Sequence, residues 1–261
     1  MRDLSKILSG MIEAGKKASL AIQEVAHRPF SVKIKEDHSP VTEADLASDK
    51  ILREMLPLDD EIFYLSEEED DDKSRLSYDE LFIVDPLDGT QDFVEKDGSY
   101  SINIAYVQNR KPVLALIFLP TSGSYCYAIK GKGSYYVEEG REERIFVSDR
   151  LDHLVYARSK THENEREREV YLRHKDKIAK VLALGASLKG VSLARGIVDC
   201  SVRYTQMTKE WDTCAMDLIV REAGGIFVDT LRREFVYNRE DVYNRDGYAM
   251  FNRKENFFLF D

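Results

Sequence analysis

Leu81-Phe-Ile-Val-Asp85-Pro-Leu-Asp88-Gly-Thr90 says more than any other segment about how this chain folds. Its four leading apolar residues predict a buried strand, and Asp85 follows where that strand ends. Pro86 lacks a backbone donor and is expected to stop the pairing, while Gly89-Thr90 can open a turn or a helix. Two carboxylates therefore lie within one turn at the carboxyl end of a strand, a common location for sites in α/β sheets.

Asp85 and Asp88 are expected to bind a divalent cation. Carboxylates this close raise each other's pKa unless a positive charge lies between them. Oxygen ligands suit a hard ion, and no His or Cys is near in the sequence, so Mg²⁺ fits better than Zn²⁺. The alternative is that both residues only cap a turn, because Asp-Pro and Asp-Gly are common turn dipeptides.

Glu67 follows another apolar run, Ile62 to Leu65, so a second strand is expected to end in an acid. The acids from Glu69 to Asp72 are instead interpreted as a solvated loop. Asp45 lies three residues after Thr42, where it can complete a helix capping box. Asp212, in Glu210-Trp211-Asp212-Thr213, can equally be a helix N-cap.

Apolar periodicity predicts a layered α/β body. Helices are expected over residues 3–27, 42–55, 163–174, 187–194 and 211–223. Strands are expected over residues 62–65, 81–84, 101–107, 113–119, 124–129, 135–137, 181–184, 197–204 and 226–229. Gly131-Lys132-Gly133 is interpreted as a hairpin turn, because it lacks the Lys-Ser/Thr ending and the following helix of a phosphate loop. A composition shift near 148–160 predicts lobes of residues 1–150 and 151–261.

Charge and composition exclude several classes of protein. The 261 residues include 48 acidic and 38 basic ones, a net charge of −10, which disfavours nucleic-acid polymers and anionic membranes as partners. No apolar run approaches the about 18 residues of a membrane span, and the start of the chain has no signal-peptide pattern, so a cytoplasmic location is expected. The three cysteines are widely spaced, which indicates neither disulfides nor a thiolate zinc site.

Four motifs together resemble one known family, the lithium-sensitive, magnesium-dependent phosphatases of the inositol monophosphatase superfamily. They are Asp85-Pro-Leu-Asp88-Gly-Thr90, Asn103 in Tyr-Ser-Ile-Asn-Ile-Ala, Trp211-Asp212-x-x-Ala215 and Glu222-Ala-Gly-Gly225. The order of elements agrees over residues 1–261. The resemblance implies an αβαβα sandwich of the sugar-phosphatase type, with most metal ligands in the N-terminal lobe and Asp212 and the specificity residues in the C-terminal lobe.

The resemblance also implies roles for individual residues. Asp85 would bridge two Mg²⁺ ions, with Glu67 and the Leu87 carbonyl completing one shell and Asp88 and Asp212 the other. A third, weakly held Mg²⁺ would also bind Glu67, which it would share with the first ion. Thr90, hydrogen-bonded to Asp45, would orient the attacking water, and the amides of Gly89 and Thr90 would bind the phosphate. Lithium inhibition is expected on the same ground.

Within the superfamily, the chain is most similar to 3′(2′),5′-bisphosphate nucleotidases. The similarity rests on Val41-Thr42-Glu43-Ala44-Asp45, Leu65-Ser66-Glu67-Glu68, Arg158-Ser159-Lys160-Thr161-His162, Ser187-Leu188-Lys189, Glu210-Trp211-Asp212-Thr213 and Tyr237-Asn238-Arg239-Glu240-Asp241. The chain departs from the family at Gln91-Asp92, where nucleotidases often have Lys-Glu, and at 203–207, which lack the usual Pro-Arg. These departures leave the ligand of a second phosphate open.

Lys189, Ser159 and His162 are candidate substrate contacts. Lys189 could reach a second phosphate from its helix, or it could be a solvated surface lysine. Ser159 and His162 could equally be a loop serine and a surface histidine without a role in binding.

The expected substrate is a small phosphorylated metabolite, 3′-phosphoadenosine 5′-phosphate, hydrolysed to AMP and phosphate by a monomer or homodimer. An inositol monophosphatase or other sugar phosphatase is the first alternative. The second is a non-catalytic cation-binding module, which Thr90 and Asp45 argue against because passive binding needs no water activator.

Overall fold

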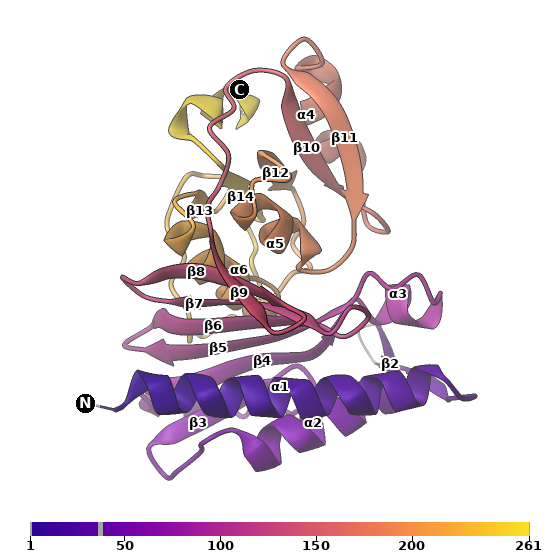
Figure 1. The fold of residues 1–261 in the computed structure, drawn as a ribbon, viewed down its shortest axis with the longest axis vertical. Helices are drawn as coiled ribbons and strands as arrows, with labels where there is room; N and C mark the ends of the chain where they lie inside the picture. The colour runs from indigo at the N-terminus through magenta and orange to yellow at the C-terminus, as the bar shows by residue number, and fades with distance from the viewer. Residues whose placement is uncertain (1, 36–38, 261) are drawn as a thin grey trace.

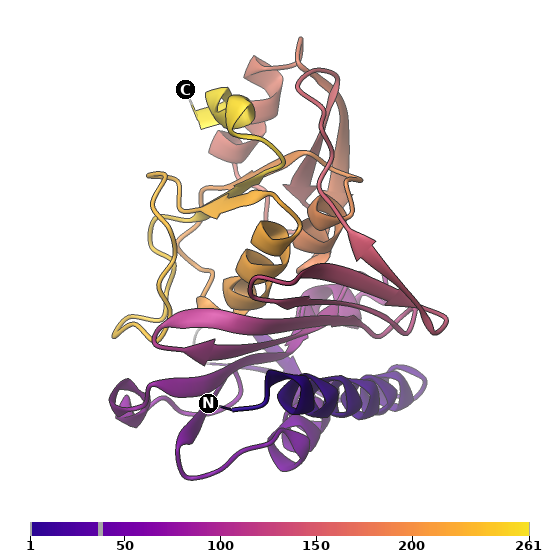
Figure 2. The ribbon, with the colours of Figure 1, turned by 60° about the vertical axis from the view of Figure 1, so that its left-hand side comes forward.

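A computed structural model describes residues 2–35 and 39–260, which form alternating layers in the order α, β, α, β, α (Figure 1). The view in Figure 2 shows the same stacking from another side. This arrangement confirms the expected layered sandwich. The two helices at one end of the stack form its first outer layer (Figure 1).

The first layer consists of α1 (Leu4–Ala26) and α2 (Glu43–Met55). Apolar residues at spacings of three and four give α1 a buried stripe that packs on the sheet, together with residues of α2. Thr42 caps α2 and Asp45 completes the capping box. Both helices follow the predicted ranges closely.

The second layer is a seven-stranded sheet in which β3 and β4 are parallel and all later neighbours antiparallel. In spatial order its strands are β3 (Ile62–Ser66), β4 (Glu80–Asp88), β5 (Ser101–Gln108), β6 (Lys111–Leu119), β7 (Ser124–Ile129), β8 (Gly133–Glu138) and β9 (Arg141–Ile145). The parallel pair brings the carboxyl ends of β3 and β4 together, where Glu67 follows β3 and Asp85 lies near the end of β4.

The third layer holds α5 (Leu188–Ala194) and α6 (Glu210–Glu222), which lie between the two sheets (Figure 1). Buried side chains of both helices form one apolar cluster with residues of both sheets. The helix ends of this layer are therefore held by packing on both sides, which favours a fixed geometry for the residues they carry.

The fourth layer is a five-stranded sheet, with helices outside it. In spatial order its strands are β11 (Ile178–Leu184), β10 (Leu154–Ser159), β12 (Cys200–Arg203), β14 (Tyr248–Phe251) and β13 (Ile226–Val228). Outside it, α4 (Glu165–Arg173) and the 3-10 helix η2 (Lys254–Phe260) contribute Val170 and Phe257 to a cluster with strand residues. Smaller elements are β1 (Val32–Ile34), β2 (Pro40–Thr42), η1 (Ser74–Ser77) and α3 (Thr90–Val94).

The structure adds strands that the sequence did not predict: β1, β2, β9, β10 and β14. β9 is an edge strand with mostly charged, exposed side chains, as expected for an edge that resists aggregation, and so it lacks apolar alternation. β10 falls inside the segment interpreted as a lobe boundary. The division into residues 1–150 and 151–261 stays a prediction.

Pro86 interrupts the pairing of β4 but does not end it. The ladder runs from Glu80 to Asp85, shifts register, and resumes where Asp88 lies opposite Ser101. The expectation that pairing stops at Pro86 is therefore wrong. The irregularity lets both Asp85 and Asp88 point toward the same site, a recurrent use of bulges beside functional residues.

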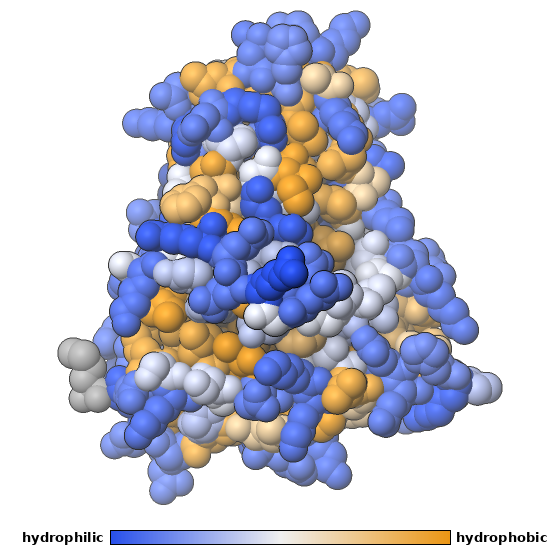
Figure 3. All heavy atoms as spheres, in the orientation of Figure 1, coloured by the Kyte–Doolittle hydropathy of each residue, from blue (hydrophilic) through white to orange (hydrophobic). Residues whose placement is uncertain are grey.

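Two negative expectations concern the same described residues. Cys126, Cys200 and Cys214 are buried and free. Within residues 2–35 and 39–260, no helix is both long enough and apolar enough to cross a bilayer. On the face drawn in Figure 3, hydrophilic side chains cover much of the outline and form a band across the middle, with hydrophobic patches above and below that band.

Candidate active site

A cavity of about 510 Å³ opens where β3 and β4 end against the third layer. All predicted site residues line it except Asp45: Glu67, Asp85, Leu87, Asp88, Gly89, Thr90, Ser159, His162, Lys189 and Asp212. Residues far apart in the sequence thus meet at one place, and the cavity is of a size that suits a small metabolite.

Three carboxylates form the centre of the cavity wall. Asp85, Asp88 and Asp212 each offer an oxygen within 4.8 Å of the others. Burial raises the pKa of Asp85 well above its usual value, and the charges of Glu67, Asp88 and Asp212 raise it further. The pKa of Asp212 is raised well above its usual value, and that of Glu67 is also raised, with burial the largest cause in both.

This donor set fits a hard divalent cation. The cluster presents only carboxylate oxygens, which Mg²⁺ and Ca²⁺ prefer, and it contains neither thiolate nor imidazole. A bound cation would remove the repulsion that raises the carboxylate pKa values. The turn-capping alternative for Asp85 does not account for such crowding, although Asp85 Oδ1 does accept a hydrogen bond from Leu87 N at 3.0 Å.

Asp88 is oriented by neutral donors. Its Oδ2 accepts hydrogen bonds from Ser187 Oγ at 2.7 Å, Asn103 Nδ2 at 3.0 Å and Ser101 Oγ at 3.4 Å. Asn103 and Ser187 belong to the quoted motifs, but the sequence alone assigned them no task. They fix the rotamer of Asp88 while its other oxygen stays available to a cation.

Asp212 is held at the start of α6, but not as its N-cap. Lys209 is the N-cap residue, and Asp212, in the third helical position, accepts a hydrogen bond from the Lys209 amide. The expected N-cap role is therefore wrong by position, although the side chain does satisfy a free amide of the helix N-terminus. The amide bond uses Asp212 Oδ2, and a carboxylate has a second oxygen that can bind a cation, so capping and cation binding are compatible.

Asp45, which is buried, and Thr90, which is half-buried, form a pair beside the acids. Thr90 Oγ1 lies 2.9 Å from Asp45 Oδ1, and Asp45 Oδ2 accepts bonds from the Thr42 amide at 2.7 Å and hydroxyl at 2.6 Å. Asp45 thus completes the capping box and also contacts Thr90. Its role in orienting the attacking water stays a prediction. Burial raises the pKa of Asp45, and its hydrogen bonds to Thr42 and Thr90 act in the opposite direction.

Gly89 is required by its backbone conformation and its surroundings. Its φ is +91°, and a Cβ would lie 3.1 Å from the Ser99 carbonyl oxygen and 3.2 Å from Ala186 Cβ. Gly89 is also the N-cap of α3, so the first amides of this helix have no acceptor within the helix.

Lys189 is buried, with 5% of its surface exposed, so the interpretation as a solvated surface lysine is wrong. Its Nζ donates to the carbonyls of Ala186 at 2.7 Å and Leu184 at 3.3 Å. Burial, and next the charge of Arg203, lower the pKa of Lys189 to about 8. Such a lysine is costly to bury and is more often functional than incidental.

Ser159 and His162 lie at the end of β10, on the wall of the same cavity. Ser159 Oγ accepts a hydrogen bond from the His162 amide at 3.2 Å, and Arg203 Nη2 donates to the His162 carbonyl at 3.1 Å. Burial lowers the pKa of His162, so its imidazole is neutral near pH 7.

Two lysines beside Glu67 were not predicted. Lys35 Nζ lies 3.7 Å and Lys209 Nζ 3.9 Å from Glu67 Oε1. Lys209 directly precedes Glu210-Trp211-Asp212, and that adjacency is the one signal in the sequence that could have pointed to it. Spacing does not show that its side chain reaches an acid more than 140 residues away.

Comparison with known proteins bears on what this arrangement does. The family model described as the inositol monophosphatase family matches residues 3–254. The chain belongs to the inositol monophosphatase family. As a member of this family, it is a phosphatase that hydrolyses esters of small phosphorylated compounds, and enzymes of the family are metal-dependent. The expectation of an enzyme is confirmed, and the non-catalytic module is set aside.

Individual members of the inositol monophosphatase family are similar over most of the chain. The 3′(2′),5′-bisphosphate nucleotidase CysQ of Aggregatibacter actinomycetemcomitans is 32% identical over 94% of this chain and 92% of its own. The Haemophilus influenzae protein of the same name is 30% identical over 95% and 91%. The crystal structure of CysQ from Bacteroides thetaiotaomicron, a bacterial member of the family, has a TM-score of 0.81 and 30% identity, over 94% of this chain and 97% of that one.

Proposed function

We propose that this chain is a magnesium-dependent 3′(2′),5′-bisphosphate nucleotidase that hydrolyses 3′-phosphoadenosine 5′-phosphate to AMP and phosphate. The observation that carries the proposal is that one cavity is lined by a carboxylate cluster and also by two buried cations, Lys189 and Arg203. The acids, through their metal ions, suit one phosphate, and the buried cations suit another. The names of the relatives support the same substrate class.

Mg²⁺ would be held by Glu67, Asp85, the Leu87 carbonyl, Asp88 and Asp212, as two ions with a third sharing Glu67. The crowding of the Asp85, Asp88 and Asp212 oxygens supports their part in this assignment, and Glu67 and Leu87 line the same cavity. When bound, Mg²⁺ neutralises charge on the reacting phosphoryl group and lowers the pKa of water.

Thr90 and Asp45 would position the attacking water and take its proton. Thr90 has a single hydroxyl hydrogen, which is directed at Asp45 or at the Leu87 carbonyl, 3.1 Å away. Its lone pairs are then available to accept a hydrogen bond from water. Burial of Asp45 raises its pKa, which makes the carboxylate a stronger base than an exposed one.

The remaining predicted residues would bind the substrate. The amides of Gly89 and Thr90, at the first turn of α3, would donate to the oxygens of the reacting phosphate. Lys189 donates two of its three N–H groups to carbonyls, and the third would contact a second phosphate, with Ser159 and His162 beside it. The bond from water oxygen to phosphorus forms, the bond to the 3′ oxygen breaks, and that oxygen takes up a proton.

A substrate panel tests the proposal. Phosphate release from 3′-phosphoadenosine 5′-phosphate would be compared with release from inositol 1-phosphate and fructose 1,6-bisphosphate, each with Mg²⁺ and with a chelator. We expect the nucleotide to have at least about tenfold the kcat/KM of the others, because a substrate that places no phosphate beside Lys189 leaves this buried ammonium with the carbonyls of Leu184 and Ala186 as the hydrogen-bond partners of its charge. Activity should vanish with the chelator.

A preference for inositol 1-phosphate would overturn the nucleotidase assignment and leave the phosphatase intact. Full activity in the chelator would overturn the role of Mg²⁺. The proposed setting is the cytoplasm, with the chain acting as a monomer or a homodimer.

A further inference from the structure

Lys209 brings a positive charge to the acids of the cavity. Its Nζ lies 3.9 Å from Glu67 Oε1, 14% of its side chain is exposed, and it lines the cavity. The residue immediately precedes α6, whose third residue is Asp212. The proposed function gives Lys209 no task, although it lies beside Glu67, an expected metal ligand.

Two aromatic rings confine the ammonium group. Lys209 Nζ lies 5.2 Å from the centre of the Trp211 ring and 5.5 Å from that of Tyr243. Both distances are within the range of cation–π attraction. These contacts favour the side-chain conformation in which the ammonium group faces the cavity, and they would be lost if the side chain turned toward solvent.

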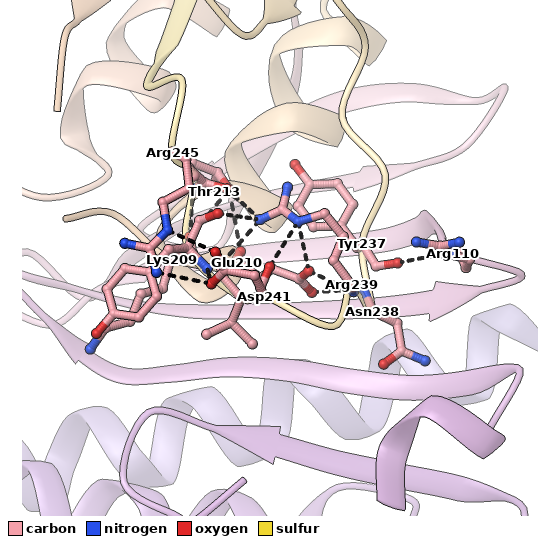
Figure 4. Close-up of polar contacts among 12 residues, drawn as sticks. Arg110, Lys209, Glu210, Thr213, Tyr237, Asn238, Arg239, Asp241 and Arg245 are labelled. Carbon is pink, nitrogen blue, oxygen red and sulfur yellow. Dashed lines mark hydrogen bonds and ion pairs between the residues drawn. The ribbon is translucent and has the colours of Figure 1, made fainter. Parts of the chain in front are cut away.

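The backbone of Lys209 is fixed by the segment that follows Tyr237. Glu210 accepts hydrogen bonds from the amides of Asn238 at 2.7 Å and Arg239 at 2.8 Å (Figure 4). Arg239 Nη2 donates to Asn244 Oδ1 at 2.8 Å, and Asn244 Nδ2 donates to the Lys209 carbonyl at 2.8 Å. The start of α6 and the segment from Asn238 to Asn244 thus hold each other in place.

Lys35, the other lysine beside Glu67, differs in its surroundings. Its Nζ lies 2.7 Å from Glu68 Oε1, closer than the 3.7 Å that separates it from Glu67 Oε1. Much of the Lys35 charge is therefore compensated by Glu68. Both lysines lower the pKa of Glu67, Lys35 more than Lys209, and Lys209 also lowers that of Asp212 in opposition to burial.

A fixed cation at this position has opposite effects on two kinds of ligand. It repels a second cation at Glu67, so Mg²⁺ binds more weakly than the acids alone would allow. It attracts a phosphate dianion that enters the same cavity. We propose that Lys209 is a phosphate-binding residue whose charge strengthens the binding of phosphate and weakens the binding of Mg²⁺.

The proposal rests on the proposed function in one respect, the presence of a divalent cation at the acids. Its test is calorimetry on the full chain, with Mg²⁺ alone and then with inorganic phosphate at saturating Mg²⁺. For Lys209→Met we expect Mg²⁺ to bind about tenfold more tightly and phosphate about tenfold more weakly, since each changes by the loss of one nearby charge. Lys209→Arg should restore both constants to near the wild-type values.

Opposite signs separate this role from structural damage. The proposal would be overturned if Lys209→Met bound both Mg²⁺ and phosphate more weakly, or if neither binding constant changed. Lys160→Met is the matched control, because Lys160 pairs with Asp97 and not with the cluster, and neither constant should change. If the substrate panel disfavours the nucleotide, the nucleotidase assignment fails but the binding constants for Mg²⁺ and phosphate still test the role of Lys209. A wild-type protein that binds no Mg²⁺ would overturn both proposals.

Discussion

Asp212→Asn is expected to lower kcat/KM by at least about 100-fold, the upper end of the loss when a residue that only supports a metal ligand is removed. Asparagine keeps the shape of the side chain and an oxygen that accepts from the Lys209 amide, so the helix start should survive. It removes one negative charge from the cluster that Asp212 shares with Asp85 and Asp88. Steady-state rates over a Mg²⁺ titration measure the effect.

The same helix supplies a matched control at its other end. Glu222 accepts hydrogen bonds from the amides of Gly131 at 2.7 Å and Gly133 at 2.9 Å, in the predicted hairpin turn. Glu222→Gln also removes one charge from an acid that accepts hydrogen bonds from amides. It should leave kcat/KM within about twofold, because Glu222 is not among the residues that line the cavity. Wild-type rates in Asp212→Asn would exclude this residue from the metal site.

The metal-free stability of Asp212→Asn provides a second measurement. Burial and like charges raise the pKa of Asp212 in the folded protein, so its ionisation opposes folding. The stability associated with the protonated form is fully present below the ordinary pKa of 3.8 and is lost as pH rises through the folded value. At neutral pH without metal the variant should therefore be no less stable than the wild type.

Thr90→Ala is expected to lower kcat by about 10²- to 10⁴-fold, the range for loss of a group that moves a proton in the transition state. The hydroxyl is the atom that contacts Asp45 Oδ1 in the structure, and alanine removes it without adding volume. The affinity for Mg²⁺ should change little, since Thr90 contributes no side-chain ligand to the carboxylate cluster. Single-turnover rates and Mg²⁺ calorimetry separate the two quantities.

Thr90→Ser is the control, because it restores a hydroxyl at the same position. It should retain most of the wild-type kcat, and Asp45→Asn should resemble Thr90→Ala, since it removes the negative partner of that hydroxyl. Equal rates in Thr90→Ala and Thr90→Ser would show that packing, and not the hydroxyl, accounts for the effect.

The metal site was predictable from the sequence because its acids belong to local patterns. Asp85 and Glu67 each follow an apolar run that forms a strand, and parallel pairing of those strands brings both to one edge. Asp212 required the second signature, since nothing in the spacing alone indicates that α6 starts beside that edge. Convergence of distant elements is a property of the fold, which here came from the family resemblance.

The remaining parts of the site depend on contacts that a linear pattern does not contain. Lys189 lies on a short helix with no marked polar face, so the sequence could not show whether its side chain is buried or solvated. In the structure it is buried and donates to the carbonyls of Leu184 and Ala186. Lys209 reaches Glu67 across the cavity. Side chains that meet through tertiary packing carry no periodic signal.

The unpredicted strands have comparable physical reasons. β9 is charged because it is an edge, and β14 is a four-residue buried strand, too short to distinguish by alternation. β14 pairs with β12 and β13, and its partners lie far away in the sequence. Such a strand is specified by its neighbours in the sheet more than by its own residues.

Anomalous X-ray diffraction from crystals of this chain grown with Mn²⁺ and inorganic phosphate tests the gathering of acids around shared cations most directly. Mn²⁺ prefers the same oxygen ligands as Mg²⁺ and is visible by its anomalous scattering. We expect anomalous peaks among Glu67, Asp85, Asp88 and Asp212, with the phosphate in contact with them. Peaks elsewhere, or a phosphate bound in the cavity without any cation at these acids, would contradict it.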